Sequence, residues 1–117
     1  MHRLIQWERE FQVWHYTVSY SQLLLRSLGH DDGDTRVDIL FSNVYLMHLR
    51  PAFAQLRIDL AEDDWTRDAV ALPRGVPAKW YVLNEDEGYV LATDCQWHED
   101  RGDHHSPSKF GPLRGVE

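Results

Sequence analysis

Short runs of alternating apolar and polar residues, separated by turn-forming residues, constrain the fold of this chain most strongly. Residues 55–60 (QLRIDL) alternate between apolar and charged side chains, with Leu56, Ile58 and Leu60 against Arg57 and Asp59. Successive side chains of a β-strand point to opposite faces, so this pattern predicts a strand with one buried face. Residues 79–97 (KWYVLNEDEGYVLATDCQW) predict a hairpin, because two aromatic and apolar runs flank the turn-forming residues 84–88.

The first half of the chain is strand-like as well. Residues 11–20 (FQVWHYTVSY) are rich in aromatic and β-branched residues, which favour strands. In residues 21–27 (SQLLLRS), Leu23 and Leu25 share one face, and we expect both in the core. Leu24 lies on the opposite face, and we expect it at an edge or an interface.

Residues 35–49 (TRVDILFSNVYLMHL) continue the pattern. The alternation predicts one buried face and one solvent face, with Val37, Ile39 and Phe41 buried and Arg36, Asp38 and Leu40 on the other side. Ser42 and Asn43 predict a tight turn, because Asn tolerates the left-handed backbone conformation. Residues 44–49 would then return as the paired strand. The alternative is one long strand that bends through Asn43.

Together these runs predict an all-β or mainly β fold. We expect an antiparallel sandwich or partly open barrel of six to eight short strands, with at most one short helix, near residues 65–71. Residues 1–97 would form a single β-rich domain. Residues 98–117, which are polar and contain Gly and Pro, would form a loosely ordered C-terminal tail.

Charge and composition argue against several classes of function. The 117-residue chain carries 19 acidic and 12 basic residues, a formal net charge of -7, so nucleic acid is an unfavourable partner. Apolar runs are far shorter than the roughly 20 residues that a membrane-spanning helix needs. Cys95 is the only cysteine and cannot form an intrachain disulfide, which suggests a cytoplasmic, reducing location.

Short motifs that carry chemistry elsewhere lack their context here. Residues 98–105 (HEDRGDHH) offer His, Glu and Asp side chains, but not in the spacing of a zinc site, and the segment predicts a solvated tail. Its RGD tripeptide at 101–103 is read as a chance match. The DDGD run at 31–34 lacks the spacing of a calcium loop. Cys95 continues a strand alternation, and we expect it to be buried and structural rather than nucleophilic. We therefore assign no catalytic residue, no metal ligand and no cofactor.

Acidic side chains gather in three predicted loops. The residues are Asp31, Asp32 and Asp34, then Asp63 and Asp64, and finally Glu85, Asp86 and Glu87. One interpretation is that these are solvated loops that keep the protein soluble. The other is a negative surface that binds a basic protein, which would make the chain a non-enzymatic binding domain.

Two segments of the front half resemble known domains. YTVSYSQLLLRS (16–27), followed by TRVDILFSNVYLMHL (35–49), resembles small uncharacterised bacterial β-rich domains. The pattern Leu40-Phe41-Ser42-Asn43-Val44 is similar to that of some toxin-immunity domains. The resemblance implies a stand-alone bacterial domain with an immunity-type inhibitor as one role. It brings no catalytic residue to any position of this chain.

Two further hypotheses follow from the aromatic and apolar residues. A small-ligand barrel or a modest enzyme would use a pocket lined by His15, His48, Tyr16 and Trp80, although these rings would serve equally to fill a core. Self-association is the other hypothesis. An exposed edge strand carrying Leu24 or Leu46 would pair with a second copy to give a homo-oligomer.

Overall fold

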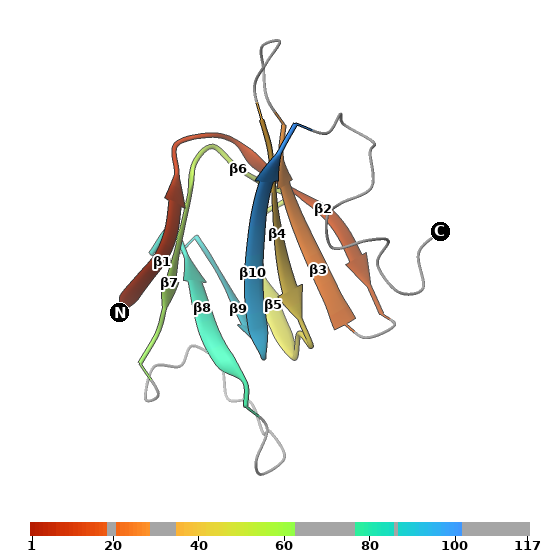
Figure 1. Cartoon of the computed structure of the whole chain (residues 1–117). Helices are drawn as coiled ribbons and strands as arrows, with labels where there is room; N and C mark the ends of the chain where they lie inside the picture. Colours follow the sequence, from red (N-terminus) through yellow and green to blue (C-terminus); the bar gives the residue numbers. More distant parts are fainter. Residues whose placement is uncertain (19–20, 29–34, 63–76, 86, 102–117) are drawn as a thin grey trace.

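Two antiparallel β-sheets make up the described part of the molecule (Figure 1). A computed structural model of the chain describes residues 1–18, 21–28, 35–62, 77–85 and 87–101. Within these ranges it has ten strands and no helix. The strands are β1 (His2–Trp7), β2 (Phe11–Thr17), β3 (Gln22–Ser27), β4 (Arg36–Ser42), β5 (Leu46–His48), β6 (Ala52–Phe53), β7 (Leu56–Leu60), β8 (Lys79–Leu83), β9 (Gly88–Ala92) and β10 (Asp94–Asp100).

The strand order confirms the expected all-β antiparallel class and shows a sandwich rather than a closed barrel, with ten strands among the described residues instead of the expected six to eight. The first sheet has the order β1-β7-β8-β9-β5, and the second has the order β10-β4-β3-β2-β6. The hairpin expected within residues 79–97 forms as β8 and β9, whose paired ends are Leu83 and Gly88. Its second run does not continue to Trp97 as expected, because β9 ends at Ala92 and residues 94–97 belong to β10 in the other sheet. No helix long and apolar enough to cross a membrane occurs in the described ranges.

The core lies between the inner faces of the two sheets. Its fully buried side chains come from both sheets and include Phe11, Leu23, Leu25, Ile39, Phe41, Phe53, Leu56, Ile58, Leu83 and Val90. The alternation therefore identified the inward faces correctly at Leu23, Leu25, Leu56 and Ile58. Phe41 and Tyr81 meet edge to face across the core, with ring centroids 5.5 Å apart.

Leu24 is buried, which differs from the expected position at an edge or interface. Strand β3 lies in the middle of its sheet, between β2 and β4, and not at an edge. Leu24 pairs with Leu40 on β4, and only 3% of Leu24 is exposed. Trp14 packs against these two leucines on the face of the sheet opposite to the main core. Alternation shows which face a residue is on, but it does not show whether its strand is central.

The face of β4 predicted to be in water is buried as well. Arg36, Asp38 and Leu40 are 3%, 1% and 5% exposed. Arg26 donates to Asp38 from Nε at 2.7 Å and from Nη2 at 3.1 Å, and the two residues are direct cross-strand partners. Arg36 likewise donates to both carboxylate oxygens of Asp100, from Nε and from Nη2, each at 3.0 Å. Burial is tolerated because each of these charges has a bidentate partner of opposite sign.

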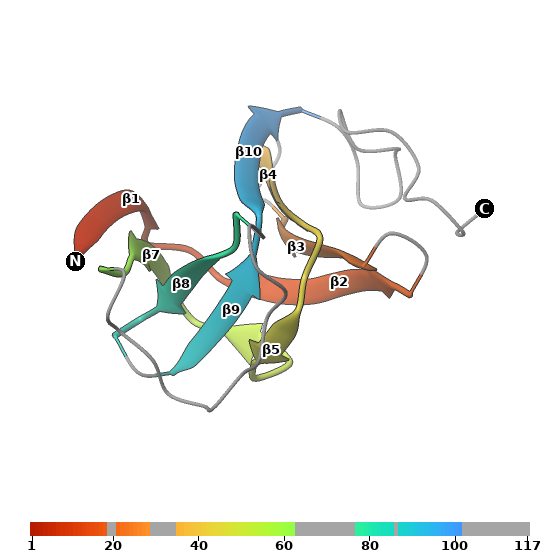
Figure 2. The ribbon, with the colours of Figure 1, turned by 90° about the horizontal axis from the view of Figure 1, so that it is seen from below.

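The chain crosses between the sheets after β4. Asn43 adopts φ 52°, as its tolerance of the left-handed region suggested, but residues 44–49 do not return alongside β4. Strand β5 pairs with β9 in the first sheet, and β4 pairs with β3 and β10. Figure 2 shows the chain leaving β4 in one sheet and entering β5 in the other. The expected β4–β5 hairpin was wrong because local turn chemistry does not specify which sheet receives the next strand.

Some expectations lie at or beyond the edge of the described residues. Strand β10 continues through His98, Glu99 and Asp100, past the expected domain boundary at residue 97. The remainder of the expected tail, residues 102–117, lies outside the described residues, and so does the helix expected near residues 65–71. Strands β1 and β6 were not anticipated individually, since neither shows a long alternating pattern.

Burial on both faces of β3 predicts similar sensitivity at three neighbouring leucines. Leu23→Ala and Leu25→Ala should each lower the free energy of unfolding by about 2–5 kcal/mol, and Leu24→Ala by at least about 2 kcal/mol, because each removes fully packed methyl groups. Guanidinium denaturation of each variant measures this. Met47→Ala, at a side chain that is 39% exposed, is the control and should cost less than about 1 kcal/mol. A Leu24→Ala variant as stable as the parent would contradict the buried position.

Candidate functional site

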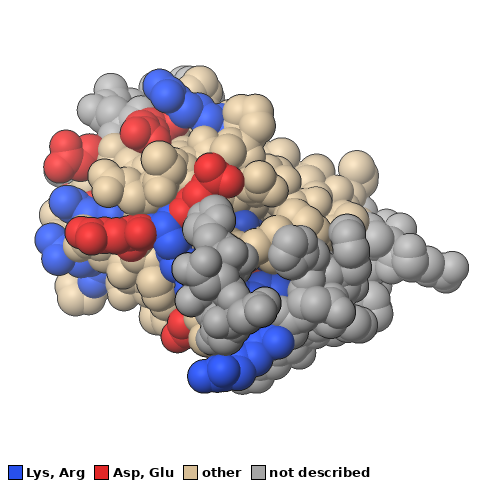
Figure 3. Space-filling model, turned by 90° about the horizontal axis from the view of Figure 1, so that it is seen from above, with Lys and Arg blue, Asp and Glu red and all other residues tan. Residues whose placement is uncertain are grey.

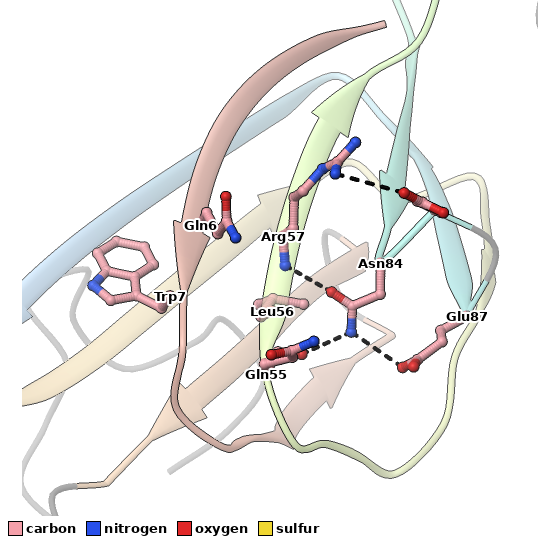
Figure 4. A pocket seen from close by; sticks show the side chains of 8 residues that line it. Gln6, Trp7, Gln55, Leu56, Arg57, Asn84 and Glu87 are labelled. Atoms are coloured by element: carbon pink, nitrogen blue, oxygen red, sulfur yellow. Dashed lines mark hydrogen bonds and ion pairs between the residues drawn. The ribbon is translucent and has the colours of Figure 1, made fainter.

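A polar recess lies at one end of the first sheet, where the end of β1, the start of β7 and the β8–β9 turn meet (Figure 4). Its volume is about 300 Å³. The residues that line it are Gln6, Trp7, Gln55, Leu56, Arg57, Asn84, Glu85 and Glu87. Aromatic, amide and charged side chains therefore share one concave surface, and such surfaces are the usual places for ligand and partner contacts.

Asn84 holds the recess together. Its Oδ1 accepts a hydrogen bond from the backbone N–H of Arg57 at 2.7 Å, and its Nδ2 donates to the backbone carbonyl of Gln55 at 2.7 Å. Nδ2 also donates to Glu87 Oε2 at 3.1 Å (Figure 4). The carboxamide thus continues the pairing of β7 with β8 beyond the last paired residue, in the way that one peptide group would.

The backbone of the turn is constrained as well. Asn84 has φ 49° and Glu85 has φ 65°, both in the left-handed region. Asn occupies this region readily, whereas a side chain such as that of Glu pays a steric penalty there. Gly88 ends the turn at a close approach, because a Cβ at this position would lie 2.8 Å from the carbonyl oxygen of His48. Position 88 therefore requires glycine where β9 begins.

The recess carries more negative than positive charge. Arg57 Nε donates to Asp59 Oδ2 at 2.9 Å, and Arg57 Nη1 lies 3.6 Å from Glu85 Oε1. Asp59 is buried on the outer face of the sheet, so its interaction with Arg57 is the better shielded of the two. The Glu85 side chain is 78% exposed. The lining thus carries one guanidinium, which contacts Asp59 and Glu85, and two carboxylates, Glu85 and Glu87, so the rim of the recess is negative.

The remaining lining is neutral. Trp7 is half-buried and packs against Phe11, with ring centroids 6.1 Å apart. Gln6 and Gln55 are exposed, and each carboxamide can donate and accept hydrogen bonds. Trp7 pairs with the buried Leu56 and packs against the core, and in Figure 4 it lies across β1 from Asn84 and Glu87, so the amide and charged side chains form the polar side of the recess.

Only part of the predicted acidic surface is described. Glu85 and Glu87 lie together at the recess, whereas Asp31, Asp32, Asp34, Asp63, Asp64 and Asp86 lie outside the described residues. Figure 3 shows the molecule from above the view of Figure 1, and acidic and basic side chains are interspersed among the described residues of that face. Negative charge is therefore local to particular features and does not cover the whole of this view.

The structure divides the four residues of the predicted small-ligand pocket between two sheets. His15 and Tyr16 are exposed on β2, whereas His48 lies on β5 and Trp80 on β8. His48 and Trp80 both contact Tyr89 on the outer face of the first sheet. The His48 ring stacks on Tyr89 with centroids 5.1 Å apart, and Trp80 meets Tyr89 edge to face at 5.8 Å.

Cys95 packs against the core beside β4. Burial raises the pKa of its thiol, and burial also raises the pKa of Tyr81 to about 12. A thiol that stays protonated is a poor nucleophile. No group of three or more His, Cys, Asp or Glu side chains placed to hold a metal ion occurs among the described residues.

Comparison of the chain with protein-family models, with curated proteins and with solved structures gives no match. The functional argument therefore rests on the geometry and chemistry of the chain itself.

Most of the recess had no signal in the sequence. Asn84 was expected in a turn, and an Asn directly after a strand is a known turn former, but its bonds to β7 depend on strand pairing. Gln6, Trp7 and Gln55 were not singled out, because their place beside the β8–β9 turn follows from the pairing of β1 with β7. Glu85 and Glu87 were identified, since a run of acids in a turn is visible directly.

The role of Asn84 predicts a clear effect of its removal. Asn84→Ala deletes three side-chain hydrogen bonds and should lower the free energy of unfolding by about 1–3 kcal/mol. Glu85→Gly relieves the strain of the left-handed backbone and should therefore raise the free energy of unfolding by up to about 1 kcal/mol. Urea denaturation measures both. If Glu85→Gly destabilised the protein instead, the contacts of the Glu85 side chain would outweigh the backbone strain.

The partly buried thiol of Cys95 predicts low reactivity and an alkaline loss of stability. At pH 8 a disulfide reagent that reports on thiols should react with folded Cys95 at least about tenfold more slowly than with the denatured chain. The folded state holds the proton that the unfolded state releases above pH about 8.5, so the free energy of unfolding should fall as pH rises past that value. Cys95→Ala should reduce this fall. Equal reactivity of the folded and denatured chains would contradict burial.

Proposed function

We propose that this chain is a non-enzymatic domain that binds a basic protein, with the recess around Glu85 and Glu87 as a contact for a Lys or Arg side chain. The observation that carries the proposal is the pair of carboxylates beside Asn84, whose carboxamide bonds to the backbone of β7, to Gln55 and to Glu87. A preorganised anionic site loses little entropy on binding, so modest contacts can give specific recognition.

The charge of the whole chain supports a basic partner. A formal net charge of -7 attracts a positively charged protein and accelerates the encounter, most strongly at low ionic strength. Arg57 also contacts Glu85, but the guanidinium is shared with the buried Asp59 and carries one positive charge against the two rim carboxylates. The neutral Gln6 and Gln55 would offer hydrogen bonds beside the incoming side chain.

An inhibitor of the immunity type is a specific form of this proposal. Such a domain acts by covering a surface of its target and needs no reactive group of its own. The single cysteine, without a partner in the chain, supports a reducing compartment such as the cytoplasm.

A small polar ligand is the second candidate, and the mixed lining of the recess favours it. Gln6 and Gln55 offer both donors and acceptors beside the Trp7 ring. Such a ligand would bind without a strong dependence on salt, whereas a basic partner would bind more weakly as salt increases.

Binding of a blocked hexa-arginine peptide tests the proposal. The peptide should shift the side-chain amide NMR signals of Gln6, Gln55 and Asn84, and its affinity should fall steadily between low and physiological salt. Glu87→Lys should weaken binding by about fivefold or more, because it reverses one of the two rim charges.

Glu62→Lys is the matched control. It makes the same charge change at the opposite end of β7, next to the amino group of Met1, and should leave the recess signals and most of the affinity intact. A hexa-citrulline peptide has the same shape without the charge and should not bind. If Glu87→Lys and Glu62→Lys weakened binding of the hexa-arginine peptide equally, the attraction would be diffuse and not specific to the recess. If the hexa-citrulline peptide bound independently of salt, a small polar ligand would be favoured instead.

A further inference from the structure

The four sheet edges of the described fold differ in how well they are protected. Strands β5 and β6 have three and two residues, too few to offer a long ladder, and the part of β2 that β6 leaves uncovered has a register shift between Val13 and His15. Strand β1 is longer, but its pairing with β7 shifts register between Arg3 and Ile5, and such irregular edges pair poorly. Strand β10 is different, because its seven residues pair with β4 in continuous register.

Strand β10 is hydrogen-bonded to β4 and to no second strand among those described. In Figure 1 it is the blue arrow that lies beside β4. A regular strand at the end of a sheet presents alternate backbone N–H and C=O groups to any chain that lies beside it. The backbone of β10 is therefore suited to accept one more strand.

Trp97 shows that the apolar layer is incomplete at this edge. Trp97 is the cross-strand partner of Ile39, so the two side chains share the inner face of the sheet. Ile39 is fully buried, yet Trp97 remains 42% exposed. The next side chain outward on this face would cover the indole ring.

Acidic side chains flank the exposed ring along the same strand. Asp94 and Asp100 lie on the face opposite to Trp97, and Glu99 shares its face. Asp100 binds Arg36, and Glu99 accepts a hydrogen bond from Thr35 and lies 3.9 Å from Arg9. Asp94 accepts a hydrogen bond from the side-chain amide of Gln96. Because that amide is neutral, this contact does not offset the negative charge of Asp94.

We propose that β10 binds an extended segment of a partner protein as an added antiparallel or parallel strand, with an apolar residue of that segment against Trp97 and Lys or Arg residues on the opposite face beside Asp94. Strand addition of this kind takes its affinity from the backbone and its specificity from alternate side chains. A second copy of this chain is disfavoured as the occupant, because each copy carries a net charge of -7. The inference rests on the proposed function only for the basic character of the partner.

The test uses a blocked nine-residue peptide of alternating Lys and Val, and the same peptide with its central Val replaced by Pro. The alternating peptide should shift the NMR signals of β10 and slow the exchange of its outward-facing amide protons by about tenfold or more, as ladder bonds do. The proline peptide cannot complete the ladder and should bind at least about fivefold more weakly.

Variants separate this strand from the recess. Trp97→Ala should lower the affinity for the alternating peptide by about fivefold. Asp94→Lys should do the same, and it leaves the Trp97 ring in place. Tyr45→Ala removes a similarly exposed aromatic side chain next to β5, and Glu62→Lys reverses a charge beside the amino group of Met1, away from both β10 and the recess, so both should bind the peptide as the parent does. Circular dichroism of each variant establishes that it is folded.

Three results would overturn the proposal. The first is that the alternating and proline peptides bind equally well. The second is that peptide-induced NMR shifts appear at Gln6 and Gln55 but not on β10. The third is that the protein without peptide sediments as a dimer whose interface is β10. The second result would leave the proposed function standing, since the basic peptide would then occupy the recess. If hexa-arginine failed to bind at the recess while the alternating peptide still bound along β10, the proposed function would fail and the strand proposal would stand.

Discussion

The pairing of β3 with β4 is the constraint on which the rest of the described structure depends. Each strand is buried on both faces, with leucines, Ile39 and Phe41 toward the core and the Arg26–Asp38 pair on the opposite side. A slip of one residue would exchange the two faces and place the paired charges in the apolar core. The register of these two strands is thus fixed by side chains of opposite chemistry, and β2 and β10 take their positions from it.

The same constraint explains why both proposed binding features lie at the margins. The centre of the second sheet has little freedom to vary, whereas the β8–β9 turn and the β10 edge each lie where regular pairing ends. At the turn, Asn84 replaces missing backbone pairing and bonds to Glu87, one of the two carboxylates at the rim of the recess. At the edge, Trp97 lacks the neighbour that Ile39 has on both sides. Both features suit contact with another molecule without disturbing the core.

Sequence reasoning recovered the local elements better than their arrangement. The alternation in residues 55–60 and the hairpin within 79–97 correspond to β7 and to β8–β9, because side-chain period and turn chemistry are local properties. Leu24 was placed at an edge, and Arg36 and Asp38 in water, because pattern alone does not show that β3 is central or that each charge meets a partner across a strand. Glu85 and Glu87 were visible as acids in a turn, but the recess around them was not.

The sequence by itself determined that this chain is built of short antiparallel strands with Leu23, Leu25, Leu56 and Ile58 inward, since a period of two leaves the apolar side chains no other common face. Only the tertiary structure decided that the chain crosses from β4 in one sheet to β5 in the other, and that Gln6 and Gln55 meet the β8–β9 turn. Those outcomes depend on which strands pair, and pairing is settled by the packing of residues far apart in the chain.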